Sequence, residues 1–252
     1  MIRTAIAVFV LVVMTGFCGS LVILASLLGM RDRAGGPYDL AVWWWARSVV
    51  WASRVRVVVH HGERANAAGG VFVVNHVSLF DVLAFASVVR RAKFVAKAEL
   101  GNIPLFSRAM RSAGMVFIER DNRKAAFDSY KDVAGRVSEG SSVVVFAEGT
   151  RGKTYAIRPL KKGPFVMAIN TQAPVIPTLI HGTMKVLPPG PLHLHPGEVH
   201  VHFLEPIPTA GLDQESRNGV AATAHARMAA ELESVYGVGS ERWEPRSKVL
   251  NA

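Results

Sequence analysis

The stretch from Thr4 to Met30, near the start of the chain, contains no charged side chain. About 20 apolar residues are enough to cross the hydrocarbon core of a bilayer, so this stretch is long enough to do so with some tilt. A cleaved secretory signal has a shorter apolar region and a small-residue cleavage site, and the ending LLGMRDRAGG fits that pattern poorly. We therefore predict a retained membrane helix. The sequence does not separate a spanning helix from half of a hairpin that lies deep in one leaflet.

The basic residues on either side of this helix predict its orientation. Arg3 and the N-terminal amine precede it, whereas the residues that follow it include Arg31, Arg33, Arg47, Arg54 and Arg56. Basic residues accumulate on the cytoplasmic side of a membrane helix. We therefore expect a protein of the cell inner (cytoplasmic) membrane whose main domain faces the cytoplasm.

A second helix is predicted over residues 38–53, after a break at Ala34–Pro37. Its apolar face is formed by Val42, Trp45, Val49 and Ala52, and its tryptophans are Trp43, Trp44, Trp45 and Trp51. Indole rings favour the headgroup level of a bilayer, but a Trp-rich face can also pack on the main domain, and both interpretations can hold together. Residues 1–53 are thus predicted to form a membrane-anchoring two-helix segment.

The composition limits the remaining possibilities. The chain has 252 residues, 50% of them hydrophobic, which is enough for one sizeable domain plus something smaller. The net charge of +10 favours acidic partners such as nucleic acid, anionic lipid or phosphorylated substrates. No nucleic-acid-binding motif accompanies the charge and a membrane segment does, so we expect membrane lipids and no nucleic acid. The single cysteine, Cys18, excludes an internal disulfide framework.

Beyond residue 53, short β-branched runs alternate with helical stretches, which is typical of an α/β domain. The predicted strands are Arg54–His60, Val71–Val74, Lys93–Ala96, Met115–Ile118, Val143–Phe146, Val175–Ile180 and Glu198–Leu204. The predicted helices are Leu79–Val89, Pro104–Ser112, Lys124–Ser138, Pro164–Thr171 and Glu215–Val235. We expect this domain to cover residues 54–236 and a polar tail to cover residues 237–252.

The segment NHVSLFD, after the apolar run Val71–Val74, allows two interpretations. Ser78 and Asp81 have the Ser-x-x-Asp spacing of a helix capping box, in which His76 would be a loop residue. Alternatively, His76 is a base at the carboxyl end of a strand, where α/β proteins place their sites, and Asp81 orients its ring. The segment alone does not decide between them.

Basic side chains follow or precede other elements. Arg120 and Arg123 follow the run Met115–Ile118, and Glu148-Gly149-Thr150-Arg151 follows Val143–Phe146. Lys161 and Lys162 precede a helix with Pro164 in its first turn, a common position for binding anions. Each cluster alone fits a solvated basic loop. Together they predict a phosphate site beside His76.

These residues, in this order, resemble the glycerolipid acyltransferase family, specifically the 1-acyl-glycerol-3-phosphate acyltransferases. The matching blocks are Asn75-His76-x-Ser78-x-x-Asp81, GMVFIER from Gly114 to Arg120, Glu148 to Arg151, and PVIPTLI around Pro177. The later FLEPIPT resembles the closing strand of the family. The resemblance covers about residues 55–208, and four blocks in order are a specific signal. Glu119 departs mildly, because Asp or Asn is more familiar there.

The resemblance implies a mixed, mainly parallel sheet flanked by helices, and a role for each matching residue. His76 would be the general base and Asp81 would orient it. Asn75, Ser78, Arg120, Glu148, Gly149, Thr150, Arg151, Lys161 and Lys162 would form the substrate site, with the cations on the acceptor phosphate. The acceptor would be lysophosphatidic acid and the product phosphatidic acid. The donor would be acyl-CoA or acyl-carrier protein, with no metal or redox cofactor.

Two alternatives to this activity stay open in the sequence. One is the same chemistry on another lyso-lipid, such as a lyso-ornithine lipid, although such an acceptor would leave the cations unpaired. The other is a lipid-binding membrane protein without turnover.

A second group of histidines lies in HLHPGEVHVH, which contains His193, His195, His200 and His202. Such alternation in a hairpin can bind zinc or nickel. Because neither a cysteine nor supporting outer ligands are apparent, we expect exposed strand histidines and no metal.

Overall fold

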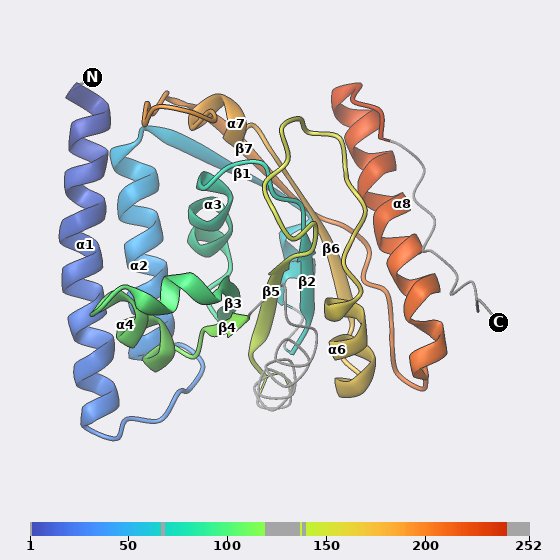
Figure 1. Cartoon of the computed structure of the whole chain (residues 1–252), viewed down its shortest axis with the longest axis horizontal. Coiled ribbons are helices and arrows are strands. Elements are labelled where there is room, and N and C mark those ends of the chain that lie inside the picture. The colour runs from blue at the N-terminus through green and yellow to red at the C-terminus, as the bar shows by residue number, and fades with distance from the viewer. Residues whose placement is uncertain (1, 67–68, 119–136, 138–139, 241–252) are drawn as a thin grey trace.

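The computed structural model describes residues 2–66, 69–118, 137 and 140–240 (Figure 1). The helices are α1 (Ile2–Leu27), α2 (Pro37–Ala52), α3 (Phe80–Val88), α4 (Phe106–Ser112), α6 (Gly163–Thr171), α7 (Thr183–Val186) and α8 (Arg217–Tyr236). The strands are β1 (Val55–His60), β2 (Val71–Val74), β3 (Ala92–Lys97), β4 (Val116–Ile118), β5 (Ser142–Phe146), β6 (Val175–His181) and β7 (Gly197–Phe203). Short 3₁₀ turns cover Gly62–Asn66, Ala98–Asn102 and Gln214–Ser216.

The seven strands form one sheet in the order β1-β7-β6-β2-β5-β3-β4. Every neighbouring pair is parallel except β6 with β7, which are antiparallel. The expected mixed, mainly parallel sheet is therefore confirmed. A parallel sheet of this kind buries both faces, and all four residues of β2 are buried accordingly.

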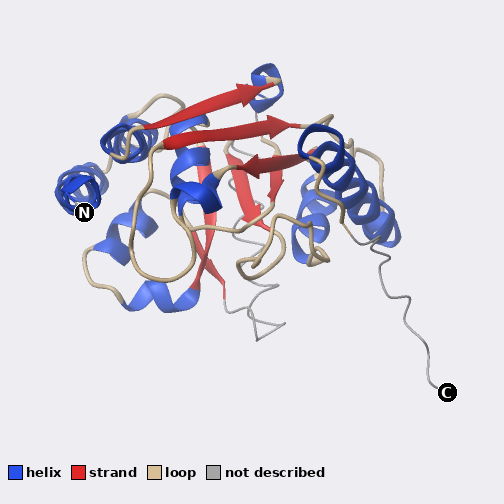
Figure 2. Cartoon of the chain, turned by 90° about the horizontal axis from the view of Figure 1, so that it is seen from above, coloured by secondary structure: helices blue, strands red, loops and turns tan. Residues whose placement is uncertain are grey.

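Different helices cover the two faces of the sheet (Figures 1 and 2). Because alternate residues of a strand point to opposite faces, Phe72 and Val74 belong to one core while Val71 and Val73 belong to the other. The first core is closed by α2 and α3, with α1 outside them. The second is closed by α6 and α8.

The helices α1 and α2 lie side by side and are attached to the domain rather than free of it (Figure 1). Trp45 Nε1 donates to Thr15 Oγ1 over 3.0 Å, which joins the two helices. Gly19 lets α1 approach α4, since a Cβ there would lie 3.3 Å from the Cβ of Ala109. Among the described residues, α1 is the one helix long and apolar enough to cross a membrane.

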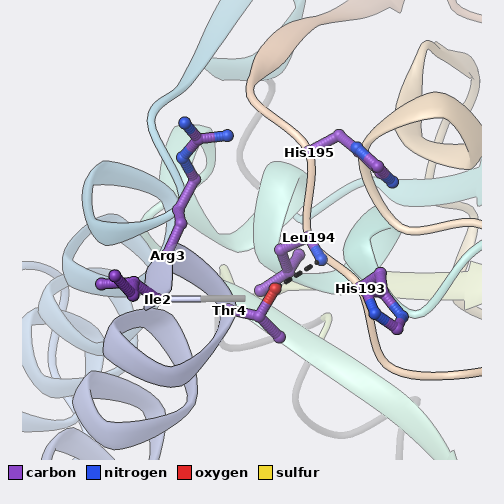
Figure 3. Close-up of a pocket in the computed structure, with 6 residues that line it drawn as sticks. All are labelled: Ile2, Arg3, Thr4, His193, Leu194 and His195. Carbon is purple, nitrogen blue, oxygen red and sulfur yellow. Dashed lines mark hydrogen bonds between the residues drawn. The ribbon is translucent and has the colours of Figure 1, made fainter.

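The first turn of α1 contacts the loop that precedes β7 (Figure 3). The backbone N–H of Leu194 donates to Thr4 Oγ1 over 3.1 Å. A cavity of about 450 Å³ lies there, lined by Ile2, Arg3, Thr4, His193, Leu194 and His195. None of these residues belongs to the predicted substrate site.

The predicted strands all match observed ones within one residue at each end, and the predicted helices that fall on described residues match within two. The helix predicted over Lys124–Ser138 lies largely outside the described residues. The four-residue helix α7 was not predicted, because it is too short to show a periodicity. The boundaries 1–53, 54–236 and 237–252 stay predictions.

Candidate active site

The predicted site lies where β2, β5 and β6 end at one edge of the sheet. Asn75 follows β2 directly and is fully buried. Its side-chain nitrogen donates to the carbonyl of Ile180 over 3.0 Å, and its side-chain oxygen accepts from the N–H of Ile180 over 2.7 Å. The amide thereby extends the pairing of β2 with β6 by one residue and fixes the chain before it reaches His76.

His76 and Asp81 are in direct contact. The ring Nδ1 of His76 lies 2.8 Å from Oδ2 of Asp81. Because an ionised carboxylate can only accept hydrogen bonds, Nδ1 carries the proton and Nε2 carries the lone pair. The ring stacks on Phe146, with centroids 4.3 Å apart. Its side chain keeps 13% of its surface exposed, so the ring is held rigidly yet remains accessible.

The same carboxylate also holds the turn that leads into α3, of which Asp81 is the second residue. Oδ2 of Asp81 accepts the backbone N–H groups of Val77 and Ser78, each over 2.8 Å. Ser78 Oγ accepts the N–H of Phe80 over 3.2 Å, as a cap residue does. The His76–Asp81 contact and the Ser78–Asp81 bond that the two interpretations of NHVSLFD predict are therefore both present. The fixed cap holds Asp81 in place, so that its carboxylate reaches the ring of His76.

Two predicted substrate contacts instead have structural partners. Ser78 is buried, and besides the capping bond its Oγ donates to the carbonyl of Leu187 over 2.9 Å. Asn75 is bonded to β6 through both of its side-chain polar atoms. The sequence pattern does not distinguish side chains that touch a substrate from side chains that hold the loop, and these two hold the loop.

The loop after β5 places the side chain of Glu148 against the backbone of His76. Glu148 is buried, and its Oε1 accepts the backbone N–H of His76 over 3.4 Å. Its Oε2 lies 2.7 Å from Nε of Arg158, which forms an ion pair with it. Burial raises the pKa of Glu148, and Arg158 opposes that shift. The carboxylate thus acts as a buried anchor for the loop that carries His76.

Gly149 brings this loop against Lys161. The residue has a φ of +83°, which is the left-handed region that favours glycine. A Cβ at this position would lie 3.1 Å from Cε of Lys161. The backbone N–H of Lys161 donates to the carbonyl of Ala147 over 2.7 Å. The two basic blocks predicted from sequence are therefore adjacent in space.

The remaining predicted residues differ in exposure. Thr150, Arg151 and Lys161 are exposed, and Lys162 is half-buried at the start of α6. Arg120 lies outside the described residues. The strand before it, β4, is at the edge of the sheet and is separated from β2 by β5 and β3.

Sequence reasoning missed two residues of this site. Arg158 pairs with Glu148, and it also bonds to the hydroxyl and the carbonyl of Thr150. Thr183 Oγ1 donates to Oδ1 of Asp81 over 2.5 Å. Thr183 follows β6 at the same sheet edge, so examining the end of every strand would have found it. Arg158 lies in an irregular loop, where no sequence signal marks it.

None of the residues at this site belongs to a metal-binding cluster. Among the described residues, one group of three His, Cys, Asp or Glu side chains has ligand atoms close enough for a metal ion: His60, His200 and His202. These belong to β1 and β7.

Comparisons with known proteins find relatives of this chain. A curated 1-acyl-sn-glycerol-3-phosphate acyltransferase of Cocos nucifera is 29% identical over 198 residues, covering 78% of this chain and 63% of the relative. One of Brassica napus is 36% identical and covers 60% of this chain and 45% of the relative. The chain thus spans less than two thirds of the length of these plant relatives. A Haemophilus influenzae enzyme of the same name is 28% identical and covers 71% of this chain and 75% of the relative.

A solved structure has a similar overall fold. The crystal structure of the 1-acyl-sn-glycerophosphate acyltransferase from Thermotoga maritima superposes with a TM-score of 0.75 and 27% identity, covering 93% of this chain and 96% of that one. The Acyltransferase family matches residues 56–181, a range that contains His76, Asp81 and the Glu148–Arg151 loop. With half of its length matched in this way, the chain belongs to the acyltransferase family.

Proposed function

We propose that this protein transfers an acyl chain from a thioester donor to the sn-2 hydroxyl of 1-acyl-sn-glycerol-3-phosphate, which gives phosphatidic acid. The observation that carries the proposal is the contact of His76 Nδ1 with Asp81 at the end of a central strand. It leaves Nε2 of an accessible ring as a proton acceptor. The names of the relatives in bacteria and plants support the same reaction.

The proposed chemistry uses one base and no covalent intermediate on the protein. Nε2 of His76 takes the proton of the acceptor hydroxyl while the oxygen attacks the thioester carbonyl. Asp81 stabilises the imidazolium that forms. When the tetrahedral intermediate collapses, the carbon–sulfur bond breaks and the ring returns its proton to the thiolate. A positioned base of this kind typically contributes about 10²–10⁴-fold to the rate.

The basic side chains would bind the acceptor phosphate. Arg151 and Lys161 are exposed beside the Glu148–Gly149 turn, and Lys162 precedes the first turn of α6. Guanidinium groups match phosphate oxygens with two parallel hydrogen bonds, and a helix N-terminus adds a favourable dipole. We assign Arg120 to the same phosphate by its place in the sequence.

We also propose that the outer faces of α1 and α2 are immersed in the cytoplasmic membrane while the site faces the cytoplasm. Phe9 and Phe17 on α1 and Trp51 on α2 each expose more than 60% of their surface. An apolar surface of this extent is costly in water. The packing of α1 on both α2 and α4 supports a hairpin seated in one leaflet over a helix that crosses alone.

The test is acyl transfer by the purified full chain in detergent. Lysophosphatidic acid is offered with acyl-CoA and then with acyl-carrier protein, to wild type, His76→Ala and His193→Ala. His193 is an exposed histidine outside the site and serves as the matched control. We expect phosphatidic acid from wild type and His193→Ala, and at least about a hundredfold less from His76→Ala.

Any other result would contradict one part of the proposal: the base, the acceptor or the turnover. Wild-type turnover by a folded His76→Ala variant excludes His76 as the base. If product forms from another lyso-lipid but not from lysophosphatidic acid, that other lyso-lipid is the acceptor. Tight binding of lysophosphatidic acid without transfer from either donor indicates a lipid-binding protein.

A further inference from the structure

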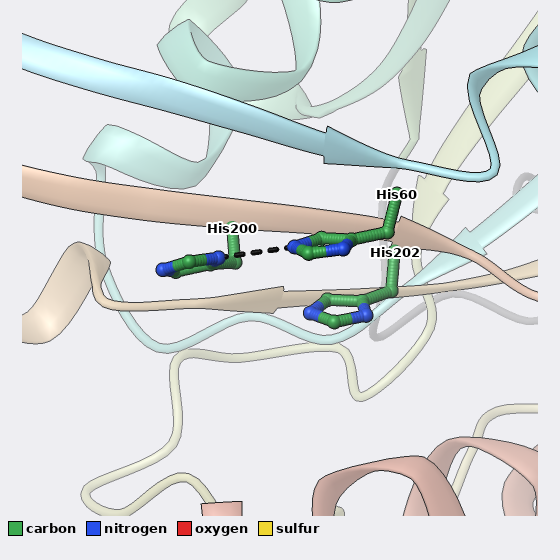
Figure 4. Close-up of side chains that lie close together, drawn as sticks. All are labelled: His60, His200 and His202. Carbon is green, nitrogen blue, oxygen red and sulfur yellow. Dashed lines mark hydrogen bonds between the residues drawn. The ribbon is translucent and has the colours of Figure 1, made fainter. Parts of the chain in front are cut away.

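Three histidines from two strands lie together on one face of the sheet, apart from the acyltransferase residues (Figure 4). His60 ends β1 and lies opposite His202 of β7 in the parallel pairing, and His200 is two residues before His202 on the same face. One ring nitrogen from each histidine lies within 4.8 Å of the others. Residues 140 positions apart in the chain are thus brought into contact.

The spacing of the first two rings fits two ligands of one cation. His60 Nε2 lies 3.0 Å from His200 Nδ1. Zinc–nitrogen bonds of about 2.0–2.1 Å in a tetrahedral site place neighbouring nitrogens about 3.3 Å apart. A single proton bridges the two nitrogens in the metal-free pair, and a cation would take its place with a small separation of the rings.

The ring of His202 must move before it can bind the same cation. His202 is stacked on His60 with centroids 4.0 Å apart and planes 10° apart, so their lone pairs run side by side. Its Nε2 bonds to the hydroxyl of Tyr236 over 2.7 Å. To bind the same cation, the ring of His202 turns out of the stack and exchanges that bond for the metal.

One carboxylate already occupies an outer position that metal-binding histidines use, and a second lies near another. His202 Nδ1 lies 2.8 Å from Oε1 of Glu231 on α8. His200 Nε2 lies 3.8 Å from Oε2 of Glu198. A histidine that binds zinc usually donates its other N–H to a carboxylate, which fixes the ring and raises its basicity. The expectation of exposed strand histidines is wrong for His202, which is buried, and for His200, which is half-buried. Glu231 and His60 are distant in the chain from the HLHPGEVHVH segment, so these neighbours were not apparent when no metal was expected.

Imidazole is a preferred ligand of zinc, and the mixture with a carboxylate is common in zinc proteins.

We propose that His60 Nε2, His200 Nδ1 and His202 Nε2 bind a divalent cation of the zinc type, with Glu231 and Glu198 as the outer carboxylates. The bound cation ties α8 to the β1–β7 edge of the sheet. The proposal is independent of the acyl-transfer chemistry.

The test is a titration of the full chain with zinc chloride. The protein is purified in detergent without a polyhistidine tag and treated with a chelator, which is then removed. Binding is followed by calorimetry, and the melting temperature is measured with and without Zn²⁺. The variants are His60→Ala, His200→Ala and Glu231→Gln, and the matched control is the double variant His193→Ala/His195→Ala from the same histidine-rich segment.

We expect one Zn²⁺ per wild-type chain and a rise in melting temperature on binding, because the cation binds the folded state. Binding should be at least about tenfold weaker in His60→Ala and His200→Ala. It should weaken by about 10–100-fold in Glu231→Gln, the range seen for outer partners of metal ligands. The control should bind as wild type does.

Three results would overturn the proposal. The first is no saturable binding to wild type. The second is an equal loss in the His193→Ala/His195→Ala control, which would indicate adventitious binding by the exposed segment. The third is unchanged affinity in both His60→Ala and Glu231→Gln, which would show that the cation binds elsewhere.

Discussion

Thr183 Oγ1 lies 2.5 Å from Oδ1 of Asp81, and both side chains are fully buried. The other carboxylate oxygen of Asp81 accepts from the ring of His76 and from two backbone N–H groups. The carboxylate is therefore held on both oxygens. Its orientation toward His76 depends on α7, the short helix that Thr183 begins. Gly182, which precedes α7, has a φ of +96°, and a Cβ there would lie 2.3 Å from the carbonyl oxygen of Glu198.

Thr183 is thus expected to act as a positioning residue. Thr183→Val keeps the shape of the side chain and removes the hydrogen bond to Asp81. A hydrogen bond to a charged group is worth about 1.5–3 kcal/mol, so we expect kcat to fall about tenfold or more, with little change in KM for the acceptor. Thr183→Ser restores the donor and should recover most of the rate. Equal kcat values in the Val and Ser variants would show that the hydroxyl has no such role.

Asp81 should matter for stability as well as for rate, because its carboxylate also holds the capping turn that leads into α3. Asp81→Asn replaces an oxygen pair that accepts four hydrogen bonds with an amide that accepts fewer. We expect acyl transfer to fall at least about a hundredfold, as for His76→Ala, and the stability to fall by about 1–2 kcal/mol. His76→Ala should lose rate with a much smaller change in stability. Kinetics and urea unfolding of the two variants separate these effects. Equal stabilities would exclude the capping role.

The sequence predicted the strands and the contact of His76 with Asp81, but not the contacts between residues distant in the chain. Every strand except β3 contains at least two β-branched residues, and these short runs predict the strands within one residue at each end. His76 and Asp81 are five residues apart, and local spacing is enough to predict their contact. Arg158 and Thr183 are distant in the chain from the residues that they contact, so local spacing alone does not predict these contacts. The contacts of His60 and Glu231 with His202 also join residues distant in the chain, so local spacing does not predict them either.

Asn75 is a different case, because a residue predicted to contact the substrate bonds to Ile180 through both of its side-chain polar atoms. Asn75→Ala would leave the buried N–H and carbonyl of Ile180 without their partner. Each unsatisfied buried group costs about 1–3 kcal/mol, so for the two groups we expect a loss of roughly 2–6 kcal/mol in urea unfolding. The KM for lysophosphatidic acid should change little in the folded fraction at low temperature. A large increase in KM with unchanged stability would restore the substrate-contact interpretation.

The tryptophans of α2 should divide into two groups in a bilayer. Trp44 and Trp51 expose 57% and 77% of their surface, whereas Trp45 points to Thr15 of α1. In vesicles with bromine-labelled acyl chains, which quench indole fluorescence on contact, we expect the double variant Trp44→Phe/Trp51→Phe to lose most of the quenching. Trp45→Phe is the matched control and should keep most of it. The reverse pattern would mean that the outer face of α2 lies away from the lipid.

Arg158 should become more important as the pH rises. Burial already raises the pKa of Glu148 above its usual value of 4.5, and the ion pair with Arg158 opposes the shift. Arg158→Leu removes that opposition, so the pKa of Glu148 in the folded state should rise further. An acid with a raised folded-state pKa favours folding while it is protonated, and that contribution is lost as the pH rises through the folded-state pKa. The variant should therefore resemble wild type most closely near pH 4.

The gap in unfolding free energy between the two chains should then widen between the folded-state pKa of Glu148 in wild type and the higher one in the variant, where the buried carboxylate ionises without its partner. Urea unfolding at several pH values measures the gap directly. The double variant Arg158→Leu/Glu148→Gln carries no charge at either position, and its difference from wild type should vary less with pH. A gap that stays constant for Arg158→Leu would show that Arg158 contributes through its bonds to Thr150 alone and leaves Glu148 unaffected.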